Sequence, residues 1–159
     1  MTTGIRNNKD QKYQLLKGIN LMGLDLRGYD FTGCDLEGAS FQGSNLTGGK
    51  LSGASLERAN LSGANLEDAC LLDVSFSKAN LTGANLTGAN LTAAYLYEAN
   101  LTGANLTGAN LSNASLCEAK LTGANLSNAN LRNAYLYEAI LTDADMTGVD
   151  MTDADFDPV

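Results

Sequence analysis

The chain of 159 residues is long enough for one domain, carries a formal net charge of −8 and contains no histidine. This acidic balance argues against nucleic acid or an anionic membrane as the main partner, and no apolar run approaches the ~20 residues of a membrane span. The cysteines, Cys34, Cys70 and Cys117, lack CxxC spacing, so we expect no disulfide framework, no metal site, and reduced thiols in a cytoplasm.

Residues 1–18 precede any regular pattern, and their polar start lacks the apolar core of a secretory signal. Basic residues outnumber acids in this segment. Tyr13, Leu15 and Leu16 suit a cap over the exposed edge of the structure that follows. Two interpretations stay open, a cap or a frayed tail.

Residues 19–158 are a continuous repeat of five residues. Every fifth residue from Leu21 to Phe156 is Leu, Phe or Met, and we call this the leucine position. Two residues earlier stands Ala in most units, Asn or Asp usually precedes the leucine position, and Thr or Ser and then Gly commonly follow it. A period of five fits neither a helix nor a plain strand.

We therefore predict that each five-residue unit forms one short side and one corner of a coil. The leucine position and the Ala two residues before it alternate correctly to point inward together. The segment Leu-Thr-Gly-Ala suits a type II turn, in which the third residue needs a positive φ that Gly supplies at little cost.

A longer period of 20 residues predicts how many sides one coil has. Every twentieth residue from Gly23 to Gly123 is glycine. In the series that begins at Gly38, by contrast, the residues at 58, 78, 98, 118 and 138 are charged. Twenty residues are four units, so the coil has four sides. All six Asp residues that directly precede a leucine position fall in the first or last complete coil, and in this register none stacks on another.

The segments ANLTGANLTGANL at 79–91 and 99–111 resemble the pentapeptide repeat family, whose pattern is A(D/N)LXX, and the density of such units is similar to cyanobacterial members. The resemblance covers about residues 19–158. It implies an all-β fold, a right-handed quadrilateral β-helix, with about seven four-sided coils.

The last coil carries bulkier inward residues, Met146, Met151 and Phe156, and an acidic rim. We expect a monomer or a weak end-to-end dimer.

The sequence Ala-Tyr-Leu-Tyr-Glu-Ala occurs twice, 40 residues apart. In the four-sided register both copies share one side, with outward rings beside a column of charge, which is typical of a protein-binding surface. The alternative is that Tyr simply suits an exposed strand and that the copies descend from a duplicated block. The candidate partner-binding residues are Tyr95, Tyr97, Glu98, Cys117, Glu118, Tyr135, Tyr137 and Glu138.

The repeat sequence gives no support for a catalytic or metal-binding site. Asp143 begins a segment like a calcium loop, but its twelfth position is Ala154 where a bidentate Glu is required. Without histidine, a phosphate-binding loop or a long insertion, we expect neither an enzyme nor a cofactor.

We therefore expect a non-catalytic structural scaffold or protein-interaction module with an unknown protein partner. An alternative comes from the resemblance, since some family members protect DNA gyrase from quinolones by mimicking duplex DNA. Here negative charge gathers at one end, and the C-terminal helical module of those relatives is lacking.

Overall fold

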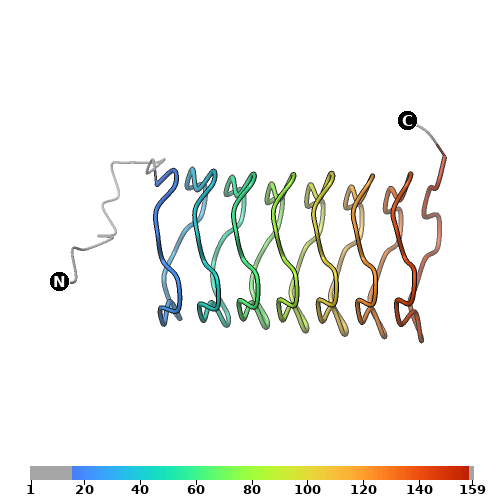
Figure 1. The fold of residues 1–159 in the computed structure, drawn as a ribbon. Helices are drawn as coiled ribbons and strands as arrows, with labels where there is room; N and C mark the ends of the chain where they lie inside the picture. Colours follow the sequence, from blue (N-terminus) through green and yellow to red (C-terminus); the bar gives the residue numbers. More distant parts are fainter. Residues whose placement is uncertain (1–15, 158–159) are drawn as a thin grey trace.

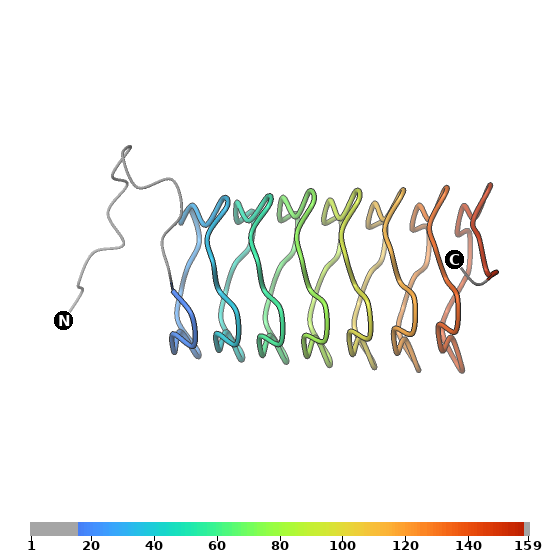
Figure 2. The same ribbon diagram turned by 90° about the horizontal axis from the view of Figure 1, so that it is seen from above.

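The structure, a computed structural model, describes residues 16–157, which form a rod of stacked coils that follow one another in chain order from the blue end to the red end (Figures 1 and 2). Within residues 16–157 there is neither a helix nor a strand longer than one bridged residue. The sides of neighbouring coils are joined instead by isolated parallel bridges between residues 20 apart. No described segment is a helix that could span a membrane.

The bridges confirm that four units complete one turn. Successive bridges begin every five residues, as at Asn20, Asp25, Asp30 and Asp35, and each joins the residue 20 positions later. The Asp residues accordingly pair with Asn45, Lys50, Ser55, Asn125, Asn130 and Tyr135, and never with one another. Carboxylates directly opposite one another would repel, so the placement of Asp follows from the register.

Backbone hydrogen bonds join each coil to the next at every unit. The N–H of Leu81 donates to the C=O of Asn100 at 2.7 Å, and the N–H of Gly83 donates to the C=O of Thr102 at 3.0 Å. The N–H of Ala84 closes the corner on the C=O of Leu81, also at 3.0 Å. The ladder is therefore continuous although no side is longer than a few residues.

The third residue of every corner from 18 to 153 has a positive φ, between 53° and 78°. A positive φ at this position alone is the signature of the expected type II turn. Glycine was predicted here, yet thirteen non-glycine residues adopt the same conformation. Stacking on a neighbouring coil thus overrides local preference.

The leucine positions and their Ala partners form one unbroken core from Leu21 to Leu136. At the first coil, Leu24 and Tyr29 occupy the Ala position and are exposed, whereas Val74 at the same position of a central coil is buried. In the last described coil, inward residues such as Met146 and Met151 are only half-buried.

The Asn before each leucine position has a second, local function that was not predicted. Its side-chain Oδ1 accepts the backbone N–H two residues later, the one N–H of the unit that has no backbone acceptor; Asn85, for example, accepts from Thr87 at 3.2 Å. Asp does the same, as at Asp30 and Asp150. Stacked Asn side chains also form amide hydrogen bonds in places, as where the Nδ2 of Asn85 donates to the Oδ1 of Asn65 at 3.0 Å.

We expect Asn85→Ala to lower the free energy of unfolding by about 1 kcal/mol, because the N–H of Thr87 loses its acceptor. The hydroxyl of Thr87, which donates to the same oxygen at 2.7 Å, loses its acceptor too. Asn85→Asp keeps this acceptor and lies between Asn65 and Asn105, so its effect should be smaller. Urea-induced unfolding compares the two variants, and an equal loss from both would contradict a role for the acceptor.

The repeat begins before residue 19. The N–H of Leu16 donates to the C=O of Asp35 at 2.7 Å, and Gly18 takes the positive φ of a corner. The cap or tail predicted for residues 1–18 otherwise lies on residues 1–15, outside the described residues. The expectation of a monomer or a weak end-to-end dimer stays a prediction.

Candidate functional site

One side of the rod and the corner that follows it carry the eight predicted partner-binding residues. Bridges join Ser75, Tyr95, Ser115, Tyr135 and Asp155 in one column. The other six candidates follow these residues by two or three positions, so the structure brings all eight together over three coils. We call this surface the Tyr/Glu face: Tyr95, Tyr97, Glu98, Cys117, Glu118, Tyr135, Tyr137 and Glu138.

The rings of the Tyr/Glu face are accessible to a partner. Tyr95 is 56% exposed, Tyr135 44% and Tyr97 38%, while Tyr137 is half-buried. The other exposed large hydrophobic side chains lie mainly near the two ends of the described rod, namely Met22, Leu24, Tyr29, Ile140 and Phe156, with Leu72 between them. The Tyr/Glu face is thus a concentration of exposed aromatic surface.

Side chains of neighbouring coils contact one another along this corner. The hydroxyl of Tyr97 donates to Oε1 of Glu118, one coil further on, at 3.1 Å. Lys78, one coil earlier, places its Nζ 3.4 Å from Oε1 of Glu98 and 5.8 Å from the centroid of the Tyr97 ring. A cation therefore already rests between a carboxylate and a tyrosine ring on this face.

The carboxylates also change the acidity of the phenols. Hydrogen bonds to Glu98 and Glu118 raise the pKa of Tyr97 to about 12, because a phenolate could not donate them. The pKa of Tyr137 is raised in the same direction by Glu138. The pKa of Glu98 is lowered, chiefly by the hydroxyl of Tyr97 and further by Lys78.

Spectrophotometric titration should show Tyr97 ionising near pH 12 rather than near the ordinary value of about 10. Since the pKa is raised in the folded protein, the stabilisation from Tyr97 is complete below pH ~10 and is lost as the pH rises towards 12. The signal of Tyr97 is isolated as the difference from Tyr97→Phe. The double variant Glu98→Gln/Glu118→Gln should return the transition towards 10, and no such return would contradict this cause.

The corner of the Tyr/Glu face is unusual in its backbone. The residues at its positive-φ position after Gly38 are Arg58, Lys78, Glu98, Glu118 and Glu138, with φ from 53° to 61°. Among the other three corners, the non-glycine residues at this position are Asp or Asn, which tolerate it best, apart from Ala93. Long charged side chains thus occupy a strained position in one corner, coil after coil.

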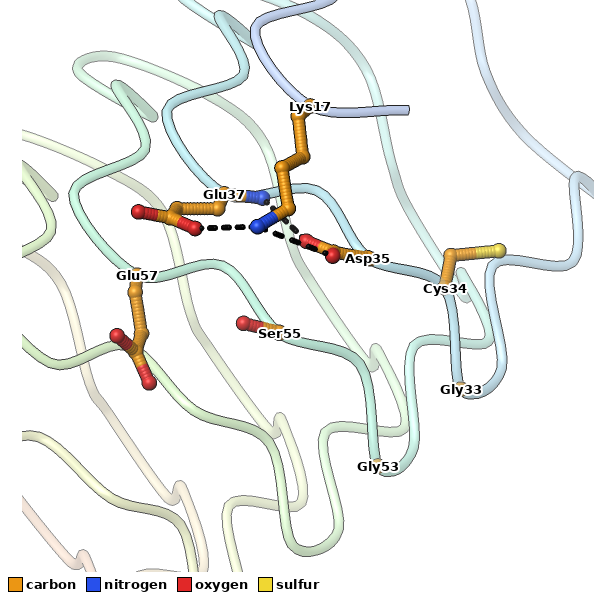
Figure 3. Close-up of a pocket in the computed structure, with 8 residues that line it drawn as sticks. All are labelled: Lys17, Gly33, Cys34, Asp35, Glu37, Gly53, Ser55 and Glu57. Atoms are coloured by element: carbon orange, nitrogen blue, oxygen red, sulfur yellow. Dashed lines mark hydrogen bonds and ion pairs between the residues drawn. The ribbon is translucent and has the colours of Figure 1, made fainter. Parts of the chain in front are cut away.

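Towards the N-terminal end, the same side carries charges that are already paired. Nζ of Lys17 lies 2.7 Å from Oε2 of Glu37 and 3.4 Å from Oδ2 of Asp35. Arg58, one coil after Glu37, places its Nη1 3.3 Å from Oε1 of Glu37. Figure 3 shows Lys17 reaching both carboxylates at the rim of a shallow pocket of about 400 Å³, which Glu57 and Ser55 also line. Lys17 was not assigned to this surface from the sequence, although it precedes Glu37 by one 20-residue period.

Metal and disulfide chemistry have no site in the part of the chain that is described. No group of three metal-ligating side chains occurs between residues 16 and 157. Cys34, Cys70 and Cys117 form no disulfide, and Cys117 lies on the Tyr/Glu face, 3.8 Å from the hydroxyl of Ser115.

A family model described as pentapeptide repeats (8 copies) matches residues 19–58, 39–77, 59–96, 84–123, 94–133 and 119–157. No curated protein matches the chain.

Solved structures of pentapeptide repeat proteins are similar to the chain, among them the following three. A pentapeptide repeat protein of the Arabidopsis thaliana thylakoid lumen is 37% identical over 70% of this chain and 71% of its own, with a TM-score of 0.28. HetL, involved in heterocyst differentiation regulation in Nostoc sp. strain PCC 7120, is 28% identical over 90% of this chain and 87% of its own, with a TM-score of 0.30. QnrB1, a plasmid-mediated fluoroquinolone resistance protein, is 18% identical over 92% of this chain and 85% of its own, with a TM-score of 0.46.

Proposed function

Because the chain belongs to the pentapeptide repeat family, whose members are known as right-handed quadrilateral β-helices and are generally structural or interaction modules, we propose that it is a non-catalytic protein-interaction module. The Tyr/Glu face is its contact surface. We place the protein in a reducing compartment such as the cytoplasm, since its cysteines are thiols.

The strained corner is the observation that carries this proposal. The fold needs only a positive φ at each corner, and glycine meets that need with the least strain. Glu98, Glu118 and Glu138 add no buried contact to the core, yet each occupies such a position. Strain that folding does not require is commonly kept where a surface has a function.

The aromatic content of the same face supports the proposal. Tyrosine offers a large contact area with few rotatable bonds, so little conformational entropy is lost when a partner covers it. The rings of Tyr95 and Tyr135 stand two coils apart, so that a partner spanning both also covers the corner column between them.

Replacing the corner glutamates by glycine tests the proposal directly. The triple variant Glu98→Gly/Glu118→Gly/Glu138→Gly should stay folded with a stability close to that of wild type, because the relief of roughly 1 kcal/mol of strain at each corner offsets the lost hydrogen bond of Tyr97 and the lost ion pair of Lys78 with Glu98. It should lose the partner that the wild-type protein captures from its source cells. Stability is measured by thermal unfolding and binding by quantitative affinity capture.

The matched control is Asn113→Gly/Asn128→Gly/Asn133→Gly, which changes the same kind of corner position outside the Tyr/Glu face. It should keep the partner. Equal capture by wild type and by the glutamate triple variant would refute the Tyr/Glu face as the contact surface.

The gyrase-binding alternative is not favoured by the distribution of charge. The corner that runs through Gly63, Gly83, Gly103 and Gly123 bears no charge at its positive-φ position over those coils, and the adjacent Thr residues are neutral. A DNA mimic would need acidic side chains along the rod. Inhibition of gyrase supercoiling by the purified protein would revive this alternative.

A further inference from the structure

The two copies of Ala-Tyr-Leu-Tyr-Glu-Ala differ in the corner residue that lies one coil earlier. In the first copy, Lys78 lies one coil before Glu98 in the corner column, 3.4 Å from its carboxylate and 5.8 Å from the centroid of the Tyr97 ring. In the second copy, the residue one coil before Glu138 is Glu118. The same tyrosine and glutamate thus hold a cation in one copy and face a second carboxylate in the other.

We propose that Tyr137, Glu138 and Glu118 form a cradle for a basic side chain of the protein partner. This inference rests on the proposed function and specifies the chemistry of its partner. The arrangement of the first copy, with an ammonium between a carboxylate and a tyrosine ring, shows the type of ligand that the second copy fits.

Burial and charge are consistent with an external cation. Tyr137 and Glu118 are half-buried and Glu138 is exposed, so the cradle opens to solvent. Among residues 16–157, neither Glu118 nor Glu138 forms an ion pair, whereas Glu98 pairs with Lys78. Lys120, on the adjoining side, forms no ion pair in that part of the chain either.

Two further acids strengthen the attraction for a cation. Asp155 follows Tyr135 in the column of bridges, and Asp157 lies two residues further on. The N-terminal half of the same side is neutralised by Lys17, Arg58 and Lys78. Uncompensated negative charge on this side is therefore concentrated around the second copy, where it would favour and steer a basic partner.

Tetralysine, observed through the ring signals of isotope-labelled tyrosine in NMR spectra, is the probe. In wild type we expect saturable shifts of the Tyr137 ring, a smaller shift at Tyr97, whose hydroxyl donates to Glu118, and little change at Tyr29. Tetralysine with acetylated side-chain amines should shift neither. Uniform shifts of all tyrosines, or none at Tyr137, would overturn the proposal.

Two charge substitutions provide matched tests within the same protein. Glu118→Lys recreates the first copy in the second and should weaken the response of Tyr137 roughly tenfold, since an internal ammonium then competes for one ring and one carboxylate. Lys78→Ala empties the first copy and should make Tyr97 respond as Tyr137 does. Ala93, in another corner, shows that alanine is accommodated at a positive-φ position of the rod.

These results separate the inference from the proposed function. If the glutamate triple variant loses the partner but tetralysine leaves Tyr137 unmoved, the interaction face stands and the cationic cradle is wrong. If Lys78→Ala leaves Tyr97 unresponsive while both variants remain folded, the analogy between the two copies is wrong.

Discussion

Leu86→Ala should lower the free energy of unfolding by about 2–5 kcal/mol. Leu86 is completely buried in a central coil, and the register places it between Leu66 and Leu106 in one inward column. Truncation leaves a cavity that the neighbouring coils cannot close without breaking their shared hydrogen bonds. For a chain of this size, the midpoint of thermal unfolding should fall by roughly 5–15 °C.

Leu141→Ala is the matched control, since Leu141 is also an inward leucine but is only half-buried in the last described coil. Its effect should be clearly smaller than that of Leu86→Ala. Equal losses at the two positions would show that stability does not follow burial along the rod.

Deleting residues 45–64 should leave a folded rod that is shorter by one coil, about 4.8 Å. The deletion joins Ser44 to Asn65, so that Asn65 and Leu66 take the places of Asn45 and Leu46, and every later residue keeps its side of the coil. Stability in stacked repeats is a sum over units and their interfaces, so the protein should lose stability without losing its fold.

Deleting residues 45–63 removes one residue fewer and should be far more damaging. Asn65 then faces the core and Leu66 faces solvent, because a shift by one residue exchanges the two faces of a short strand. Far-UV circular dichroism, thermal unfolding and small-angle scattering compare the two deletions. Similar folding of both proteins would contradict the 20-residue register.

The architecture could be predicted because the sequence repeats it at two periods. The period of five places Leu and Ala inside, and the period of 20 aligns like residues, as in the glycine column at residues 23–123. Both periods reflect contacts between identical positions of neighbouring coils, and the bridges confirm them. The same register predicted that Tyr97 and Glu98 lie on the same side of the rod as the second copy of the tyrosine motif.

Other features could not be predicted because they depend on geometry that no single residue signals. Glycine preference suggested where a positive φ would fall, but not that Arg58 or Glu118 would adopt it under the constraint of stacking. The acceptor role of Asn85 towards Thr87 depends on the angle at which the chain leaves each corner. The position of Lys78 over Tyr97 depends on side-chain conformation one coil away.

The half-buried side chains of the last described coil imply a gradient of local stability along the rod. Amide hydrogens in the central coils, where the core is sealed, should exchange with solvent only on global unfolding, whereas those near Met146 and Met151 should exchange through local opening. Tyr137 lies one coil from that end and Tyr97 three. The two copies of the tyrosine motif, identical in sequence, are therefore set in parts of the molecule with different mobility.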